Sequence, residues 1–546
     1  MQMAQKWLAN QDNQFLIFWL VGGLLFRGFI ALFLYPGFDE SYYYVYSQNL
    51  NWSYFDHPVL VALVTGFGTW LTGDVSQFTI RLGTLILHTG SLLLLYLTSV
   101  RLFSVKAARL TLAIASISPI FLIAFGILTL PDNPLMFFWS ASLYCASCEF
   151  FGQNQIQNNS EAAVSDVYHP SYRLAILSIL VGLACLGKYH GFVLGLGIVA
   201  FCLISPKHRC VFRSPWAWLG LGLFVITTSP FWLWNMQHDW VSLRFQSERG
   251  IPKRSYNILN VVLIFLVQIA YLFPTIGLPL WLVTWQESLT TVKKKLSKNI
   301  PKVDDSFGQK SLLILSVSLP VIVGFTLIAG YQQVLPAWPM PGFWGITLLL
   351  GQRATTWQKL RVQRWLKGST IVIGTALMLA LLHVTTGTLQ KPSQYALLGG
   401  FVSPKDDPST ELIDIQQLRR GFVESSLLST ALENSSFIFT NGYYLAGSIG
   451  MALMPSFHKP VTCFSLDMRG FAFWSKPNQW LGKDALYITI SRFHKKTDIT
   501  AEYQTYFDSL EEIGTVPIRR GGAVTEVFYV YQAKKLIKPY PRIYGL

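Results

Sequence analysis

The amino-acid sequence predicts an α-helical protein that crosses a membrane many times and carries a small α/β domain at its C-terminus. Of the 546 residues, 51% are hydrophobic and 13% are charged. This composition is too apolar for a soluble protein of such length. Apolar stretches of roughly 20 residues, long enough to cross a hydrocarbon core of about 30 Å, recur in the first two thirds of the chain. After residue 386 the composition changes and short strand-like segments appear.

We predict eleven membrane spans in a transmembrane domain that comprises residues 1–386. Short polar or basic loops separate the spans, and the fifth, sixth and tenth are short for a complete crossing. The predicted spans are 15–35, 81–102, 107–127, 134–152, 174–187, 190–205, 216–234, 258–285, 311–330, 337–351 and 368–386.

Lysine and arginine are distributed unevenly between the two sets of loops. With a cytoplasmic N-terminus, the inner tail and loops hold 19 basic residues, and the outer loops before residue 387 hold six. Cytoplasmic loops of membrane proteins are enriched in Lys and Arg. The sequence therefore predicts a multi-pass protein of the plasma (inner) membrane with its C-terminal domain outside the cytoplasm. The net charge of +15 then reflects topology, and we expect no binding to nucleic acid.

Two regions are predicted to lie outside the bilayer on the outer side. The first outer loop, residues 36–80, should contain two short amphipathic helices around a polar centre. The C-terminal domain, residues 387–546, has no Gly-rich phosphate loop and no metal-ligand spacing, so we expect the chemistry elsewhere. Its predicted elements are helices at 410–433 and 442–454 and strands at Phe437–Phe439, Val461–Ser465, Ala485–Ile490 and Val527–Tyr531.

Two adjacent carboxylates, Asp39 and Glu40, follow the first span in the segment FDESYYY. Tyr42 and Tyr43 stand just after them, and we expect these tyrosines to bind substrate. Charges near hydrocarbon depth cost ~2.5–3.5 kcal/mol each on insertion scales, so they indicate function. A carboxylate at this place can take the proton of an attacking hydroxyl group. The structural alternative is that the pair marks the start of a helix, because acidic residues favour the first turn.

Further acidic residues are predicted on the same membrane face. Asp56 and His57 stand in YFDHP of the first outer loop, and Asp132 stands in LPDNP between the third and fourth spans. Arg27 lies inside the first span, where an unpaired guanidinium is costly. We therefore expect Arg27 to pair with an outer carboxylate such as that of Asp39 or Asp132.

Basic residues on the outer side could bind a lipid phosphate. Lys188 and Tyr189, in GKYHG, lie at the outer end of a helical hairpin, although a lysine there could also extend only to the lipid headgroups. The segment WNMQHDWVSLRFQSERG supplies His238, Arg244 and Arg249, which could neutralise the phosphate of a leaving group. An interfacial amphipathic helix would show the same residues.

The order of these motifs resembles that of a known superfamily. The segments FDESYYY, YFDHP, LPDNPLMFFW, LGKYHG and WNMQHDWVSLRFQ resemble the bacterial membrane glycosyltransferases of the protein O-mannosyltransferase and aminoarabinose transferase superfamily, which have the GT-C fold. In the C-terminal domain, NGYYLAGSIGMAL and FSLDMRGFAFWS resemble the end of the same bacterial proteins.

This resemblance implies a polyprenyl-phosphate sugar donor, an outward-facing active site and inversion at the anomeric carbon. It further implies that Asp39 is the base, with Glu40 completing an Asp-Glu pair. By resemblance to the aminoarabinose transferases, Asp56, His57 and His238 match a site for a divalent cation, and the alternative is that these residues bind the donor phosphate. The sequence departs from that subgroup where His57 replaces its lysine and Val59 its second proline.

We therefore predict an inverting glycosyltransferase that moves a sugar from a polyprenyl-phosphate carrier to a lipid, glycan or protein acceptor of the cell envelope. Asp39 is predicted to be the base or to bind the acceptor, and Glu40 and Asp132 are predicted to shape the site. The alternative is a transporter or flippase of lipid-linked sugars, which would place polar residues near mid-membrane and often shows paired halves. A non-catalytic carrier-binding protein is a third interpretation. Neither the sugar nor the acceptor follows from short motifs.

Overall fold

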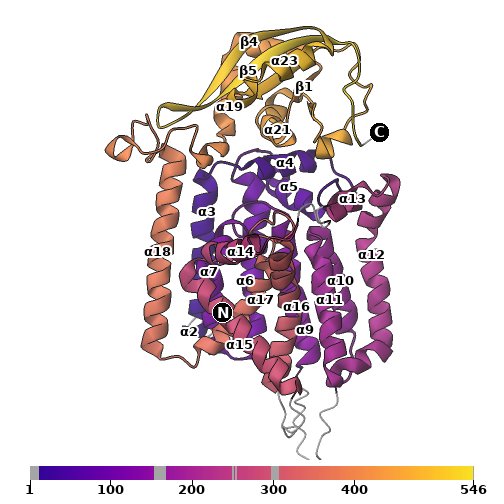
Figure 1. Ribbon diagram of the computed structural model, residues 1–546, viewed down its shortest axis with the longest axis vertical. Coiled ribbons are helices and arrows are strands. Elements are labelled where there is room, and N and C mark those ends of the chain that lie inside the picture. Colours follow the sequence, from indigo (N-terminus) through magenta and orange to yellow (C-terminus); the bar gives the residue numbers. More distant parts are fainter. Residues whose placement is uncertain (1–10, 153–167, 249–250, 252–254, 297–305, 545–546) are drawn as a thin grey trace, which may run out of the picture.

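A computed structural model describes residues 11–152, 168–248, 251, 255–296 and 306–544. Its long helices run side by side as a bundle, and a smaller sheet domain, drawn in orange and yellow, covers one end of that bundle (Figure 1). Within these residues, five helices are long and apolar enough to cross a membrane, and a sixth follows if the bent pair His190–Ile204 and Pro206–Arg213 is one span. The five are Asp12–Phe33, Thr79–Leu102, Pro215–Gln237, Ser306–Ile328 and Lys359–Thr386. The predicted number of eleven spans stays a prediction.

The helices of the bundle follow most of the predicted spans closely. The first span is one continuous helix in which a π-helical turn, Phe18–Gly22, joins α2 to α3. The bounds are α2 Gln11–Ile17, α3 Gly23–Phe33, α6 Leu82–Leu102, α7 Val105–Ile117, α8 Pro119–Ile123, α9 Asp132–Phe150, α10 Arg173–Gly187, α11 His190–Ile204, α12 Pro215–Gln237, α13 Val241–Glu248, α14 Ile258–Tyr271, α15 Pro274–Leu296, α16 Ser306–Ile328, α17 Met340–Ala354 and α18 Lys359–Thr386.

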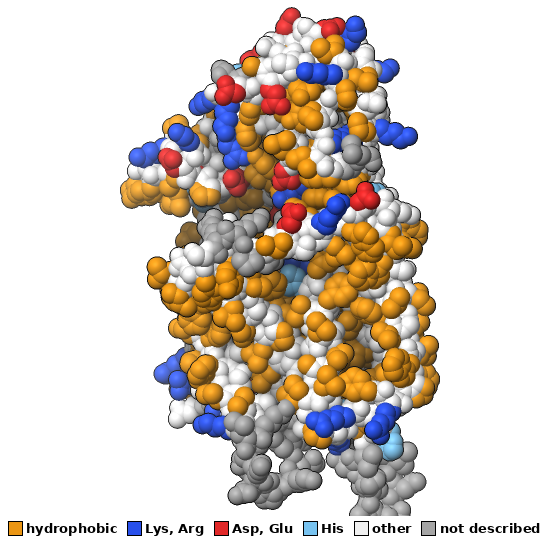
Figure 2. Space-filling model, turned by 45° about the vertical axis from the view of Figure 1, so that its right-hand side comes forward, with side chains coloured by type: hydrophobic (Ala, Val, Ile, Leu, Met, Phe, Trp, Pro, Cys, Tyr) orange, Lys and Arg blue, Asp and Glu red, His pale blue; other side chains and the backbone are white. Residues whose placement is uncertain are grey.

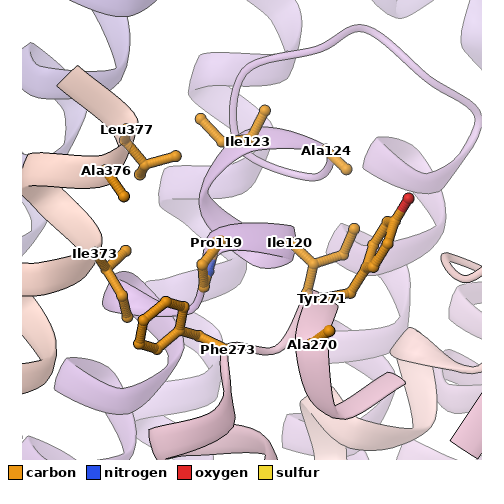
Figure 3. Close-up of a pocket in the computed structure, with 10 residues that line it drawn as sticks. All are labelled: Pro119, Ile120, Ile123, Ala124, Ala270, Tyr271, Phe273, Ile373, Ala376 and Leu377. Carbon is orange, nitrogen blue, oxygen red and sulfur yellow. The ribbon is translucent and has the colours of Figure 1, made fainter. Parts of the chain in front are cut away.

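Two predicted spans are broken. In the span 107–127 the helix ends at Ile117, because Ser118 is extended and Pro119 starts the short helix α8. The span 258–285 was wrong as a single helix: α14 ends at Tyr271, and α15 begins at Pro274 after Phe273, whose φ is +68°. Residues at both breaks, together with residues of α18, line one apolar cavity of about 440 Å³ (Figure 3).

The surface of the bundle is apolar in the way a membrane protein requires. Hydrophobic side chains cover most of the bundle on the face shown in Figure 2, while Lys and Arg lie at its lower end. Acidic side chains on this face lie on the sheet domain and at its junction with the bundle (Figure 2). Leu25, Leu219 and Ile226 are examples of large apolar side chains that remain exposed. Lipid rather than water is the solvent that accommodates such a surface.

The first outer loop forms two helices, as predicted, and they lie between the bundle and the sheet domain (Figure 1). These are α4 (Phe38–Gln48) and α5 (Leu60–Thr72). Tyr42 and Tyr46 of α4 belong to one buried cluster together with residues of the C-terminal domain such as Leu445. The helix that carries Asp39 and Glu40 is therefore held from both sides.

The C-terminal domain is built on one mixed sheet with the strand order β2-β1-β3-β5-β4. Strand β1 is parallel to β2 and β3, whereas β5 is antiparallel to β3 and β4. The predicted helix at 410–433 is two helices separated at Ser425, which caps the second. The bounds are α19 Ile415–Glu424, α20 Ser426–Asn434, β1 Phe437–Thr440, α21 Tyr443–Phe457, β2 Val461–Cys463, β3 Ala485–Ile490, α22 Ser491–His494, α23 Thr497–Gln504, β4 Phe507–Arg520 and β5 Ala523–Leu536.

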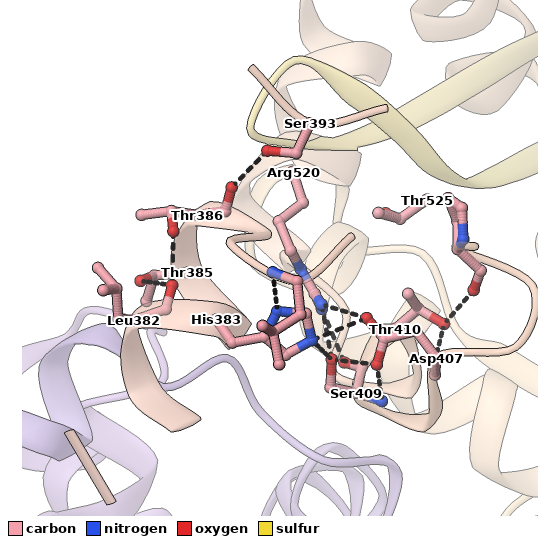
Figure 4. A network of polar contacts seen from close by, with 12 residues as sticks. Leu382, His383, Thr385, Thr386, Ser393, Asp407, Ser409, Thr410, Arg520 and Thr525 are labelled. Carbon is pink, nitrogen blue, oxygen red and sulfur yellow. Dashed lines mark hydrogen bonds and ion pairs between the residues drawn. The ribbon is translucent and has the colours of Figure 1, made fainter. Parts of the chain in front are cut away.

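A polar network joins the end of α18 to the C-terminal domain (Figure 4). His383 Nε2 lies 3.0 Å from the carboxylate of Asp407. The guanidinium of Arg520, at the end of β4, donates to the hydroxyl and the carbonyl oxygen of Ser409 at 2.8 and 2.7 Å. Its Nη1 also lies 3.6 Å from Asp407. These contacts attach the sheet to the last long helix of the bundle.

Gly447 of α21 permits the close contact between the C-terminal domain and α4. A Cβ atom at this position would lie 2.6 Å from the backbone nitrogen of Tyr42. Because backbone cannot move aside cheaply, we expect Gly447→Ala to lower stability by about 1–3 kcal/mol. Thermal unfolding of the purified protein in detergent measures this. Gly368→Ala is the matched control, since Gly368 is also helical but a Cβ there would meet open space. Equal melting temperatures for both variants would contradict the prediction.

Candidate active site

Glu40 fixes the start of α4 against the membrane helices. Its Oε2 accepts hydrogen bonds from the Gly37 N–H at 3.0 Å and from Arg81 at 2.6 Å. Its Oε1 accepts from Arg81 Nε at 2.7 Å and from the Thr129 N–H at 3.0 Å. The side chains of this ion pair are 0% (Arg81) and 2% (Glu40) exposed. With four donors on its two oxygens, Glu40 is suited to shaping the site.

Asp39 differs from its neighbour because its side chain remains exposed. Its pKa lies above the ordinary value, chiefly because the surrounding protein desolvates the carboxylate, and further because Asp56 and Glu40 lie nearby. Arg469 and Lys188 act on this pKa in the opposite direction. An accessible carboxylate with a raised pKa, placed among both carboxylates and cations, is suited to accept a proton.

Asp56 is buried, with 1% of its surface exposed, and both of its oxygens are occupied. The Tyr46 hydroxyl donates to Oδ1, and Arg469 of the C-terminal domain donates to Oδ2 at 3.1 Å. Burial alone would raise the pKa of Asp56, but His57, Arg469 and the Tyr46 hydroxyl together lower it below the ordinary value. Asp56 is therefore held as a carboxylate, whereas Asp39 is not held so firmly.

The predicted substrate-binding tyrosines are buried in contacts within the protein. The Tyr42 hydroxyl accepts a hydrogen bond from the Gly470 N–H at 2.9 Å and lies 3.3 Å from the Tyr46 hydroxyl. The ring of Tyr43 packs edge-on against the ring of His57, with centroids 5.7 Å apart. Both tyrosines are at most 4% exposed. The structure thus places Tyr42 at the junction with the C-terminal domain.

Lys188 and Asp132 contact each other. Lys188 Nζ donates to both carboxylate oxygens of Asp132 at 2.8 Å, and both residues are buried. Asp132 begins α9, and Lys188 follows α10 directly, so the pair joins the ends of two neighbouring helices. The Tyr189 hydroxyl, next to Lys188, lies 2.7 Å from the hydroxyl of Ser242 on α13. A phosphate that binds Lys188 would have to compete with Asp132 for the ammonium.

The segment that joins α12 to α13 packs on the first outer loop. His238 stacks on Trp234 with ring centroids 4.1 Å apart, and its Nδ1 lies 2.7 Å from the Trp234 carbonyl oxygen. Gln246 donates to the Asp56 carbonyl oxygen at 2.8 Å, which fixes α13 against the loop. Arg244 is exposed on α13. Arg249 lies outside the described residues.

The residues that match a cation site do not form a metal-binding group. Among the residues that the structure describes, no three His, Cys, Asp or Glu side chains are close enough together to hold a metal ion. Arg469 and Tyr46 take both oxygens of Asp56, and His238 directs Nδ1 to a backbone carbonyl oxygen. This donor set does not fit a divalent cation, which needs several free oxygen or nitrogen ligands. A requirement for a cation stays a prediction.

The expected partner of Arg27 was wrong. Arg27 is fully buried and donates a hydrogen bond to the Thr89 hydroxyl at 2.8 Å, with no ion pair among the described residues. Arg81 is the arginine that pairs with a site carboxylate, Glu40. Arg81 also donates to the carbonyl oxygens of Ala31, Leu34 and Tyr35 at the end of α3. These carbonyls have no partner inside their helix, so they attract a cation there.

Arg469 was not predicted as a site residue. It lies in the segment FSLDMRGFAFWS, which indicated only that the C-terminal domain resembles the end of the bacterial glycosyltransferases. It is 413 positions away from Asp56, so no local spacing could connect the two residues. The available signal was that an arginine follows an acidic residue within an otherwise apolar segment.

Comparisons with known proteins find similar sequences and a similar fold. The family model of dolichyl-phosphate-mannose-protein mannosyltransferases matches residues 56–157 and 163–234. Lipid A galacturonosyltransferase RgtD of Rhizobium johnstonii is 28% identical over 229 residues, which is 40% of this chain. The match covers 43% of RgtD, so this chain spans less than half the length of that relative.

Two solved structures share the fold over nearly the whole chain. ArnT of Cupriavidus metallidurans, in the apo state and bound to undecaprenyl phosphate, has a TM-score of 0.59 at 14% identity in both cases. Each comparison covers 94% of this chain and 97% of ArnT. The matched segments and the common fold confirm that this chain resembles the GT-C membrane glycosyltransferases of the protein O-mannosyltransferase and aminoarabinose transferase superfamily.

Proposed function

We propose that this protein is an inverting glycosyltransferase that moves a sugar from a polyprenyl-phosphate carrier to an acceptor on the outer face of the inner membrane. The observation that carries the proposal is the environment of Asp39. Its carboxylate is exposed and has a raised pKa, with Lys188 and Arg469 close enough to influence it. The surroundings of Asp39 thereby combine a proton acceptor, its carboxylate, with the positive charge that a departing phosphate needs.

In the proposed reaction an acceptor hydroxyl attacks the anomeric carbon of the donor sugar. The bond from that carbon to the carrier's phosphate oxygen breaks, and the configuration at the carbon inverts. Asp39 takes the hydroxyl proton, and the carrier leaves as a polyprenyl phosphate that keeps the bonding electron pair. Glu40 and Asp132 hold the helix ends around Asp39 through their ion pairs with Arg81 and Lys188.

We assign the donor phosphate to the basic residues at this end of the bundle. Lys188 would exchange Asp132 for the phosphate, and Arg244, exposed on α13, would add a second charge. Charged hydrogen bonds to phosphate oxygens would stabilise the negative charge that develops as the carrier leaves. The bias of Lys and Arg toward the other loops supports a cytoplasmic N-terminus and an outer position for this site.

Purified full-length protein in liposomes should transfer label from one of a panel of radiolabelled polyprenyl-phosphate sugars, including those of mannose, galacturonate and aminoarabinose, to crude envelope lipids, glycans or proteins. We expect label in an acceptor, with release of polyprenyl phosphate. Liposomes without the protein provide the background. Movement of donor between leaflets without labelled acceptor would contradict the proposal and favour a flippase.

A further inference from the structure

The C-terminal domain inserts one arginine into the candidate active site. Arg469 lies at the start of a single 3₁₀ turn, Arg469–Ala472, between β2 and β3. Its guanidinium donates to Asp56 at 3.1 Å and lies 3.8 Å from the centroid of the Tyr443 ring. On the other side it lies 5.7 Å from the ring centroid of Phe245 on α13. Arg469 therefore contacts the first outer loop, α13 and its own domain together.

The backbone around Arg469 is fixed by contacts with distant segments of the chain. The Arg469 N–H donates to the Tyr544 hydroxyl, and the Gly470 N–H donates to the Tyr42 hydroxyl, both at 2.9 Å. Tyr544 in turn stacks on Phe55 with centroids 4.5 Å apart. Arg469 adopts a φ of +46°, in the left-handed region that favours glycine. Such conformations persist where surrounding contacts impose them, and they concentrate at functional sites.

The position of Arg469 coincides with the one where the resemblance implies a divalent cation. Asp56 supplies a carboxylate there, but its oxygens accept hydrogen bonds from Arg469 and Tyr46. A buried carboxylate needs a positive partner, and a guanidinium meets this need with directional donors. A metal ion at Asp56 would lie where the guanidinium lies, so the two cations exclude each other.

We propose that Arg469 takes the place of a divalent cation at Asp56, so that the C-terminal domain completes the active site and sugar transfer needs no metal. Arg469 is a positioning residue: it holds Asp56 and places a positive charge beside Asp39. The proposal rests on the proposed function only for the part of its test that measures transfer.

The first part of the test measures metal binding and does not depend on activity. Purified full-length protein, dialysed against chelator, is titrated calorimetrically with Zn²⁺ and Mn²⁺, and its metal content is measured by mass spectrometry. We expect no stoichiometric site in the wild type. Weak metal binding by the Arg469→Ala variant would support the proposal if adding Asp56→Asn removes that binding, because the result reveals a vacated cation position. One tightly held equivalent in the wild type, lost in Asp56→Asn, would overturn the proposal.

The second part measures transfer with and without chelator. We expect chelator to leave the wild-type rate unchanged and Arg469→Ala to lower kcat roughly 10- to 100-fold, the usual effect of removing a residue that orients a site. Arg469→Lys should recover part of the loss because it restores the charge. Arg519→Ala, an exposed arginine on β4, is the matched control and should keep the wild-type rate.

A pH profile separates this role from a merely structural one. Arg469 and Lys188 lower the pKa of Asp39, whereas Asp56 and Glu40 raise it. Loss of Arg469 should therefore move the acid limb of kcat/KM to higher pH, and Arg469→Lys should move it back. An unmoved limb, or a wild-type rate in Arg469→Ala, would refute the proposal. If the wild type transfers no sugar from any donor, the proposed function fails, and metal binding alone decides the role of Arg469.

Discussion

Replacing Asp39 with asparagine should reduce sugar transfer by about 10²- to 10⁴-fold, the range expected when a general base is lost. Asparagine has nearly the same shape but cannot accept the hydroxyl proton. Because the Asp39 side chain is exposed and makes no ion pair among the described residues, the fold should tolerate the change. Single-turnover transfer of a labelled polyprenyl-phosphate sugar measures the rate, and equilibrium binding of the same donor should remain close to the wild-type value.

The matched control for Asp39→Asn is Asp74→Asn, since Asp74 is an exposed carboxylate of the same outer loop. The wild-type pH profile offers an independent check. Asp39 must be unprotonated to act as a base, and its pKa is raised by desolvation first and by neighbouring carboxylates second. Activity should therefore fall as the pH decreases through that raised pKa, earlier than for an ordinary aspartate. Undiminished transfer by Asp39→Asn would exclude the assigned role.

Replacing Glu40 with alanine should cause the largest loss of stability, about 3–5 kcal/mol, because it leaves the buried Arg81 without its charge partner. The Gly37 and Thr129 N–H groups also lose the acceptor that holds these two loop ends together. Thermal unfolding of the purified protein in detergent measures the effect. We expect a lower melting temperature and little protein in the membrane fraction.

The double variant Glu40→Leu with Arg81→Met tests whether the uncompensated charge is the cause. Replacing both partners of a buried ion pair by apolar residues often costs little, whereas removing one partner is strongly destabilising. We therefore expect the double variant to melt above Glu40→Ala. A double variant that is less stable than Glu40→Ala would show that the hydrogen bonds from Arg81 to the backbone carbonyls at the end of α3 matter more than the uncompensated charge.

Much of the site could be predicted because its residues lie at or beside the ends of helices. Asp39, Asp56 and Lys188 each follow or precede an apolar segment directly, and the alternation of spans places such ends on one face. In the structure these residues are indeed close enough for Asp56 and Lys188 to affect the pKa of Asp39. The roles of the side chains were harder to predict, because a charged residue next to a membrane span gives no information about its partner.

Pairings between distant segments could not be predicted. Lys188 was expected to face a phosphate, but it pairs with Asp132 from a turn 56 residues earlier. Arg27 looked like the partner of an outer carboxylate, yet Arg81 takes that position because it directly precedes α6 and lies beside the carbonyl ends of α3. Only the packing of the helices determines which of several arginines comes within reach of a given carboxylate.

The sheet illustrates the same limit at the level of strands. Runs of apolar residues predicted β1, β2, β3 and part of β5, since buried strands have continuous hydrophobic sequences. Strand β4 was missed because Glu511, Glu512 and Pro517 interrupt its alternation and its register shifts twice. It lies at the edge of the sheet, where a proline and charged side chains are tolerated.

The burial of α4 between the bundle and the sheet has a consequence for how the protein is made. Its tyrosines share one apolar cluster with Phe528 and Val530, which lie near the end of the chain. Proteins generally fold from the N-terminus during synthesis, so the bundle would assemble while the helix that carries Asp39 still lacks its contacts with the C-terminal domain. The active site would therefore mature only when β5 has left the ribosome and joined the sheet. A nascent chain without β5 would remain inert, and no sugar would be transferred before this strand has joined the sheet.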